Sequence, residues 1–263
     1  MLLALFLQLY VKFYRSFINP QAGLVPFPFG CLLKISRDLY GPEASTVRFV
    51  SRNTSIPVPR IIASARGHGH CFMLMTRVKG FNLEHVWETL TNEERSMIVS
   101  QLRAFIAELR TLSPPPCVPE GAISSLYHQP VHDIRFASIK PCGPFPSEGS
   151  FNDFLIQEAS SFVWRPEERA IIRSQLRHDH RIVFTHGDLT PRNILVQGGK
   201  VVAVIDWEDA GWFPEHWEVI KALLCPGICL ETWERAIGDI VQGDYDKELA
   251  LDRLITDRME GAI

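Results

Sequence analysis

The stretch His186–Asp206, HGDLTPRNILVQGGKVVAVID, carries the densest set of functional side chains in the 263-residue chain. It begins with a polar loop, HGDLTPRN, between two short apolar runs, IVFT and ILVQ. A Gly198-Gly199 pair then joins ILVQ to a third apolar run, VVAVI, and two runs joined by Gly-Gly are typical of a β-hairpin. The stretch therefore predicts a loop rich in chemistry, followed by a hairpin that ends at Asp206.

Three side chains of this stretch are oxygen donors. Asp188, Asn193 and Asp206 form a hard ligand set with no thiolate or imidazole, which suits Mg²⁺ when substrate phosphates complete its shell. Loops at strand ends also hold catalytic groups that are both exposed and rigid. The alternative is structural, because Asp and Asn commonly form turns between strands. For Asp188 or Asn193 alone, the structural interpretation would be preferred.

The residues before position 80 predict a small, mostly β lobe. CLLKI (31–35) is expected to be a strand that presents Lys34, and residues 42–51 have the three- and four-residue apolar spacing of a helix. IPVPR (56–60) must be extended because each proline disfavours the helical region for its predecessor. FMLMTRV (72–78) is predicted to be a second strand.

The middle of the chain predicts helices. Thr91 and Glu94 form a capping-box signature, and apolar residues then follow at spacings of four and three. We expect residues 117–150, which contain several prolines, to form a long loop over the surface. Helical patterns return at 151–163 and 166–176. The apolar side of the helix after Thr91 is expected to consist of Ile98, Leu102, Phe105, Leu109 and Leu112.

Taken together, HGDxxPxNILV, the hairpin and the following IDWExAG resemble the aminoglycoside phosphotransferase and choline kinase-like family of the protein-kinase-like fold. The subsequent Trp212–Glu218, WFPEHWE, is similar to this family and particularly to its fungal branch. The resemblance extends back through IPVPR and MTRVKG and covers about residues 31–224. It implies an α+β, two-lobed fold with an N-terminally shortened β-rich lobe. The expected domains are residues 1–80, with the N-terminal helix and nucleotide-binding lobe, and residues 81–263, a helical lobe with the catalytic loop and metal-binding hairpin.

The resemblance implies roles in ATP-dependent transfer of the γ-phosphate to a hydroxyl of a small molecule. Asp188 is similar to the catalytic base that orients the acceptor hydroxyl and takes its proton, and Asn193 and Asp206 to the Mg²⁺ ligands. His186 is similar to a histidine that supports the loop.

The same resemblance implies a nucleotide site in the small lobe. Lys34 is similar to the strand lysine that holds the α- and β-phosphates, with Glu43 as its ion-pair partner. The backbone from Met75 to Val78 resembles the segment that receives adenine. Considered alone, Lys34 would more simply be a solvated strand lysine, and only its place in the pattern favours a phosphate ligand.

The N-terminal region departs from the family pattern. The family places a β-hairpin with a phosphate-covering loop before the lysine, and only about thirty residues precede Lys34. VPFPFG (25–30) has prolines where a ladder needs donors, so we expect no paired strand there. The alternative hypothesis is therefore a non-catalytic binding or scaffold protein that has lost the phosphate-covering loop, and an active enzyme would have an impaired grip on ATP.

Composition limits the classes of partner. The chain is 46% hydrophobic and 22% charged, with a formal net charge of −3, so no global basic field favours nucleic acid. Residues 206–263 hold 14 Asp and Glu against 5 Lys and Arg, which indicates either solvated helix faces or a surface for a cationic acceptor. The acids considered for this second role are Glu208, Asp209, Glu215 and Glu218; Glu208 and Glu218 fit a structural role equally.

The apolar N-terminus, MLLALFLQLYV, is too short to cross a bilayer, which takes about 20 residues. Leu2, Phe6, Leu9, Phe13 and Phe17 recur at helical spacing, so a helix packed on the protein is expected; membrane contact through residues 1–17 is the less favoured alternative.

Cysteine and histidine usage predicts a cytoplasmic protein without a structural metal. The six cysteines form no CxxC pair, which favours reduced thiols. The pairs His68/His70 and His178/His180 have no third convincing ligand nearby, so surface histidines are favoured over zinc ligands.

Overall fold

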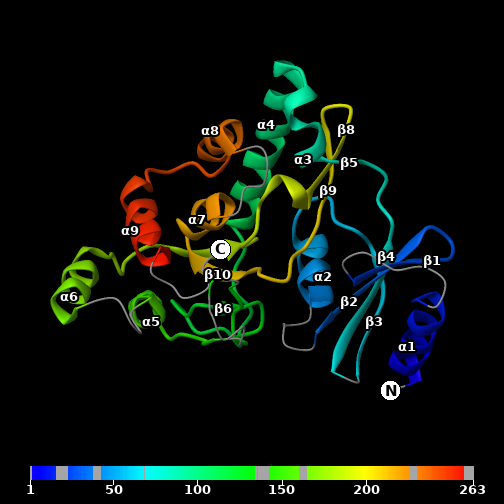
Figure 1. Cartoon of the computed structure of the whole chain (residues 1–263), viewed down its shortest axis with the longest axis horizontal. Helices are drawn as coiled ribbons and strands as arrows, with labels where there is room; N and C mark the ends of the chain where they lie inside the picture. Colours follow the sequence, from blue (N-terminus) through cyan, green and yellow to red (C-terminus); the bar gives the residue numbers. More distant parts are fainter. Residues whose placement is uncertain are drawn as a thin grey trace.

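The computed structural model describes residues 2–15, 23–37, 43–67, 69–133, 135, 142–159, 165–224 and 230–257. They form a small lobe, built on a β-sheet, beside a larger and mostly helical lobe (Figure 1). The described elements are, in chain order, α1 (Leu2–Arg15), β1 (Leu24–Phe27), β2 (Cys31–Arg37), α2 (Glu43–Asn53), β3 (Ile61–Gly67), β4 (His70–Thr76), β5 (Phe81–Asn82), α3 (Leu83–Val86), the 3₁₀ turn η2 (Trp87–Thr89), α4 (Asn92–Leu109), β6 (Ser124–Ser125), α5 (Glu148–Ala159), α6 (Pro166–Gln175), β7 (Ile182–Thr185), the 3₁₀ turn η3 (Pro191–Asn193), β8 (Ile194–Gln197), β9 (Lys200–Val204), β10 (Gly211–Pro214), α7 (Trp217–Leu224), α8 (Leu230–Ile240) and α9 (Asp246–Thr256).

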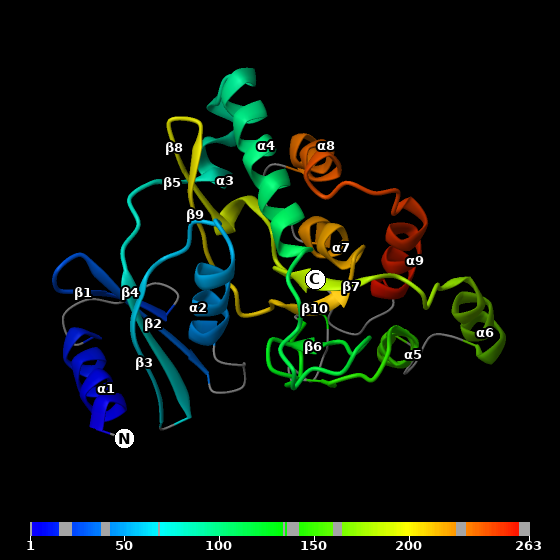
Figure 2. The ribbon, with the colours of Figure 1, turned by 180° about the vertical axis from the view of Figure 1, so that it is seen from behind.

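The small lobe is a four-stranded antiparallel sheet in the order β1-β2-β4-β3. Helix α1 lies against one face of this sheet and α2 against the other (Figure 2). Successive strand residues point to opposite faces, so Phe72 packs with the α1 side and Met73 with the α2 side. Lys34 pairs with Met73 in the β2–β4 register and shares its face. The alternation therefore directs Lys34 toward α2.

The expectation of no paired strand before Lys34 is wrong. β1 pairs antiparallel with β2, with Pro26 opposite Leu32. β1 is the edge strand of the sheet, and an edge tolerates a proline because one side of such a strand needs no ladder donors. Residues 16–22, the remainder of the region expected to be irregular or helical, lie outside the described residues.

Helix α1 forms as predicted, but it buries a different face. Ala4, Leu7 and Val11 are buried against the sheet, whereas Leu2 and Phe6 of the predicted apolar stripe are 85% and 56% exposed. This helix is apolar on most sides, so residue spacing alone could not select its packed face. Phe17 lies outside the described residues. None of the described helices combines the length and the hydropathy needed to cross a membrane.

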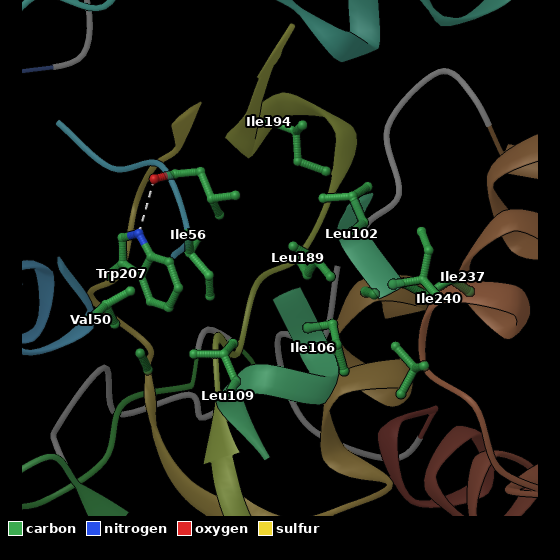
Figure 3. Packing of buried hydrophobic residues seen from close by; sticks show 14 of the residues in the cluster. Val50, Ile56, Leu102, Ile106, Leu109, Leu189, Ile194, Trp207, Ile237 and Ile240 are labelled. Carbon is green, nitrogen blue, oxygen red and sulfur yellow. Dashed lines mark hydrogen bonds between the residues drawn. The ribbon is translucent and has the colours of Figure 1, made fainter. Parts of the chain in front are cut away.

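Helix α4 contributes Leu102, Ile106 and Leu109 to the main hydrophobic core of the larger lobe (Figure 3). The predicted capping box is confirmed: Thr91 Oγ1 accepts from Glu94 N, and the Glu94 carboxylate accepts from Thr91 N. Its buried face carries Ile106 in place of the expected Phe105, which is only partly buried. The remaining buried positions of this face, Ile98, Leu102 and Leu109, are as predicted.

Two three-stranded sheets complete the larger lobe, ordered β5-β8-β9 and β6-β10-β7. The predicted hairpin is β8–β9, with Gly198 and Gly199 both at positive φ, as a two-residue hairpin turn requires. Residues 117–150 do not simply run over the surface as expected. Their described part contains the buried residues Ile123 and Phe145, which pair through an isolated bridge and enter a core with α5 and α7.

The other predicted elements differ from the structure mainly at their ends. The strand expected to reach position 78 ends at Thr76, and α2 runs to Asn53; residues 56–60 contain no helix or strand. The described part of the predicted helix at 151–163 begins earlier, at Glu148. His180 is buried, so its assignment to the surface is wrong. His68, Cys225 and Cys229 lie outside the described residues.

We predict that Thr91→Ala lowers the free energy of unfolding by about 1 kcal/mol, because it removes the side-chain acceptor for the first turn of α4. Urea unfolding followed by circular dichroism measures the change. Thr91→Ser retains the hydroxyl and is the matched control. Equal stability of the alanine and serine variants would show that the cap contributes nothing.

Candidate active site

The HGDLTPRN loop connects β7 to β8 and is held by buried groups. The Glu218 carboxylate on α7 accepts hydrogen bonds from His186 N at 2.7 Å and from Gly187 N at 3.2 Å. Burial raises the pKa of Glu218, while nearby His186 and the two backbone donors oppose that rise. Leu189, 2% exposed, anchors the middle of the loop in the core around α4 (Figure 3). The loop is therefore fixed on both sides of Asp188.

His186 supports the loop, as predicted for it. Asp188 N donates to its Nδ1 at 3.1 Å, and its Nε2 donates to Ile205 O at 3.0 Å. These partners select the tautomer with the proton on Nε2. The ring thus connects the backbone at Asp188 to the end of β9.

Gly187 has a positive φ of 80°, and a Cβ there would lie 2.5 Å from Asp209 O. Both the backbone conformation and the close approach require glycine.

The Asp188 carboxylate is partly exposed and accepts hydrogen bonds from two neighbouring side chains. Arg192 donates to its Oδ1 at 2.9 Å and to its Oδ2 at 3.1 Å, and Asn193 Nδ2 donates to its Oδ2 at 2.7 Å. These hydrogen bonds fix the orientation of the carboxylate. The Asn193 amide nitrogen also donates to Asp188 O at 2.9 Å, so its amide oxygen is the atom left to bind a cation.

Lys34 lies at the centre of three carboxylates. Its Nζ is 2.8 Å from Glu43 Oε2, 2.6 Å from Asp206 Oδ1 and 3.5 Å from Glu208 Oε2. Burial opposes its charge, but attraction from these carboxylates raises the pKa of the Lys34 ammonium above its ordinary value. The ion pair expected between Lys34 and Glu43 is therefore present, and Lys34 also contacts Asp206 from the hairpin.

The carboxylates around Lys34 differ in environment. Burial raises the pKa of Glu43, against the attraction of Lys34. Burial, followed by repulsion from Asp206, Glu43 and Asp209, raises the pKa of Glu208 to about 7, also against Lys34. Asp206 is the most exposed of the three, and its φ of 66° is unusual for a residue other than glycine. Such local strain is often found at functional sites.

The donor set fits a divalent cation. Glu43, Asp206 and Glu208 each place a carboxylate oxygen within 4.8 Å of the other two, but the Lys34 ammonium lies among these oxygens. Asp206 and the Asn193 amide oxygen are hard ligands of the kind that Mg²⁺ binds together with substrate phosphates. Ile205 N donates to Asn193 O at 2.9 Å, which joins the two segments that carry these ligands.

A pocket of about 220 Å³ lies between the sheet and the β8–β9 hairpin. Its walls are mostly apolar, with Lys34, Glu43 and Asp206 at one side, and this suits a flat heteroaromatic ring with an anionic tail. The complete lining is Leu24, Leu32, Lys34, Glu43, Val47, Pro59, Met73, Met75, Thr76, Val78, Leu195, Ile205, Asp206 and Trp207.

The structure thus brings most predicted site residues to one place. Lys34, Glu43, Met75, Val78 and Asp206 line the pocket. Asp188 and Asn193 are not among its lining residues and lie on the adjoining loop, linked to it by the hydrogen bonds of His186 and Asn193 with Ile205.

Arg192 is the residue that sequence reasoning missed. It lies four positions after Asp188 in a turn of 3₁₀ helix, and its side chain forms an ion pair with the Asp188 carboxylate. A basic residue inside the HGDLTPRN loop was the available signal.

Three of the four acids considered as amine ligands have partners within the protein. Glu218 holds the loop backbone, Glu208 lies near Lys34, and Asp209 Oδ1 lies 3.1 Å from His132 Nδ1. Glu218 is buried, which removes it from the set available to an acceptor.

Comparisons with known proteins agree with this geometry. The model of the phosphotransferase enzyme family, APH, matches residues 36–254. No curated protein matches the chain. A solved structure of a thermostable mutant of aminoglycoside phosphotransferase APH(4)-Ia, in its apo form, is 14% identical, with a TM-score of 0.59 over 89% of this chain and 79% of that one.

Two further structures show the same fold. The gentamicin complex of APH(2″)-IIa is 14% identical, with a TM-score of 0.59 over 94% of this chain and 84% of that one. APH(3″)-Id from Streptomyces rimosus, in complex with ADP and streptomycin, is 14% identical, with a TM-score of 0.54 over 96% of this chain and 98% of that one. Because the family model matches well over half of the chain, the chain belongs to the phosphotransferase enzyme family.

Proposed function

We propose that the protein is an ATP-dependent phosphotransferase that moves the γ-phosphate to a hydroxyl of a small molecule. The observation that carries this proposal is the convergence of Lys34, Glu43 and Asp206 beside an apolar pocket, next to the loop of Asp188. We further propose that residues 1–80 and 81–263 are its two domains. Structures of similar proteins contain ADP or AMP-PNP with hygromycin B or streptomycin, which supports a nucleotide and a small acceptor here.

In this proposal, the apolar part of the pocket receives adenine along the segment from Met75 to Val78. Lys34, oriented by Glu43, binds the α- and β-phosphates. Asn193 and Asp206 hold Mg²⁺, which supplies positive charge against the phosphates. Phosphoryl transfer asks a protein chiefly for such positioning and charge stabilisation.

Asp188 acts on the acceptor in this proposal. Its carboxylate accepts the proton of the acceptor hydroxyl as the hydroxyl oxygen bonds to the γ-phosphorus. The bond from the γ-phosphorus to the β-phosphate oxygen breaks, and ADP leaves. Arg192 and Asn193 hold the carboxylate in its orientation. A cationic acceptor agrees with the acidic character of residues 206–263, and Glu208, Asp209 and Glu215 are the candidates that remain once the buried Glu218 is excluded.

A non-catalytic, kinase-like binding or scaffold protein is the second candidate. It is favoured by the direct contact of Lys34 with Asp206, in which a phosphate ligand and a metal ligand neutralise each other. It is also favoured by the single strand that precedes β2 among the described residues. Absence of Mg-ATP binding at millimolar nucleotide, measured by calorimetry, would select this candidate over the enzyme.

We predict that Asp188→Asn lowers kcat by about 10²- to 10⁴-fold, because it removes the base and retains the shape of the side chain. ADP release would be measured with a panel that contains hygromycin B, streptomycin and gentamicin. Calorimetry should give the same Mg-ATP affinity for the variant and the wild-type protein. An unchanged kcat would refute the assignment of Asp188.

We predict that Lys34→Met weakens Mg-ATP binding at least about tenfold, because it removes the ammonium that binds phosphate. Isothermal titration calorimetry measures the affinity. Lys79→Met, at an exposed lysine near the end of β4, is the matched control and should bind as the wild-type protein does. If both variants bound equally well, Lys34 would not be a phosphate ligand.

A further inference from the structure

A second cluster of titratable side chains lies among the helices of the larger lobe, where none of its members lines the pocket beside Lys34. Glu148 begins α5, His180 precedes β7, His216 lies between β10 and α7, and Glu248 belongs to α9. Helix α9 contacts both α5 and α7, so these parts of the chain meet in space (Figure 1). All four side chains line one small cavity.

His180 is held in a defined orientation. Its Nδ1 lies 2.6 Å from Glu148 Oε1, and its backbone N donates to Glu148 Oε2 at 3.0 Å. With Nδ1 bonded to a carboxylate, the ring presents Nε2 as its second nitrogen. A carboxylate on one imidazole nitrogen is the usual support of a histidine that binds metal through the other.

Two buried nitrogens of the cluster have no hydrogen-bond partner. They are His180 Nε2 and His216 Nδ1, and each residue is at least nine-tenths buried. Burial lowers the pKa of His216 to about 3, so this imidazole is neutral at physiological pH. A buried polar atom without a partner costs free energy, which a bound ligand would recover.

The spacing of the two histidines fits a metal ion. A ring nitrogen of His180 and one of His216 lie within 4.8 Å of each other and of a Glu148 oxygen, a group to which Glu248 does not belong. Glu248 Oε1 lies 3.3 Å from His180 Nε2 without forming a hydrogen bond. Two ligands of a tetrahedral Zn²⁺, at about 2.0–2.1 Å from the ion, are separated by roughly 3.3 Å.

The cavity is sized for an ion and not for an organic molecule. Its volume is about 20 Å³, and a space of roughly 10–15 Å³ already holds one water molecule. Two carboxylates, Glu148 and Glu248, accompany the two imidazoles in this cavity, and such a donor set suits a divalent cation. An ion pair of His180 with the two carboxylates would leave His216 Nδ1 without a partner.

We propose that His180 Nε2 and His216 Nδ1 bind Zn²⁺ and that a Glu248 oxygen, which lies 3.3 Å from His180 Nε2, turns toward the ion as its third ligand. Glu148 is then the outer carboxylate that orients His180. Two imidazoles and one carboxylate are a ligand set that zinc proteins use, with a water molecule in the fourth position. The ion would join the start of α5, the segment before β7, the β10–α7 junction and α9. Catalytic zinc sites use this ligand set, but the cavity of about 20 Å³ has no room for a substrate, so the ion would have a structural role here. The proposal does not depend on the proposed phosphotransfer.

The test uses the full chain without a polyhistidine tag, stripped with EDTA and dialysed. We expect one Zn²⁺ per chain in a competition titration against a chromophoric chelator, and a higher Tm on addition of Zn²⁺. We expect Co²⁺ to give the visible absorption of a four-coordinate site. Less than one-fifth of an equivalent of bound Zn²⁺ would overturn the proposal.

Variants locate the ion. His216→Gln and Glu248→Gln each remove a ligand and should weaken Zn²⁺ binding at least about 100-fold; Glu148→Gln, which perturbs the outer carboxylate, should weaken it about 10- to 100-fold. Glu248 lies at the edge of the cluster, so its variant provides the test if His216→Gln does not fold. His85→Gln, at an exposed histidine of α3, is the control and should bind Zn²⁺ normally.

The Mg²⁺ ligands of the proposed active site provide a second control. Asp206→Asn should leave the affinity for Zn²⁺ unchanged, whatever it does to turnover. Loss of Zn²⁺ binding in this variant, with retention in Glu248→Gln, would place the ion in the active site and overturn the proposal. An NMR spectrum that showed His180 doubly protonated in the presence of excess Zn²⁺ would also overturn it.

Discussion

The buried carboxylate of Glu218 is the constraint on which the candidate active site depends. It accepts from two consecutive backbone amides, at His186 and Gly187, and so fixes where β7 ends and the loop begins. The side chain of His186 extends this constraint to two further segments. One ring nitrogen bonds the backbone of Asp188, and the other bonds the end of β9 at Ile205. The carboxylate of Asp188 is thereby placed relative to Asp206 by a chain of hydrogen bonds within one lobe.

The side chain of Lys34 connects the small lobe to the segment that follows this loop. It projects from β2 toward α2, contacts Glu43 there, and reaches Asp206 from the hairpin of the larger lobe. One ammonium is thus surrounded by three carboxylates at the boundary between an apolar pocket and the loop, where these groups are partly removed from water. Electrostatic interactions are stronger in such a place than at the open surface. The ion pairs of Lys34 with Glu43 and Asp206 therefore link the sheet of the small lobe to the hairpin of the larger lobe.

Much of this arrangement could be predicted because its signals are local. The Gly-Gly turn, the capping box of Thr91 and the alternation around Lys34 each depend on a few neighbouring residues, and the structure contains all three. Predictions from the sequence were wrong where tertiary packing determines which residues are buried or paired. The sequence could not show which side of the apolar helix α1 is buried, nor that a proline is acceptable in β1 because this strand lies at an edge. His180 was predicted to lie at the surface without further ligands, because its partners are 32 or more residues away in the chain.

The conformation of Gly187 limits which substitutions the sequence can accept while it keeps this fold. Solved structures only 14% identical to this chain keep its fold, so most positions in the fold accept replacement. Position 187 is constrained twice, by a left-handed backbone and by the carbonyl of Asp209 at 2.5 Å from any added Cβ. A compensating change at one neighbour could relieve the contact but not the backbone conformation. A mutational scan of the loop should therefore find position 187 intolerant of every side chain, including the smallest, even in a background selected for extra stability.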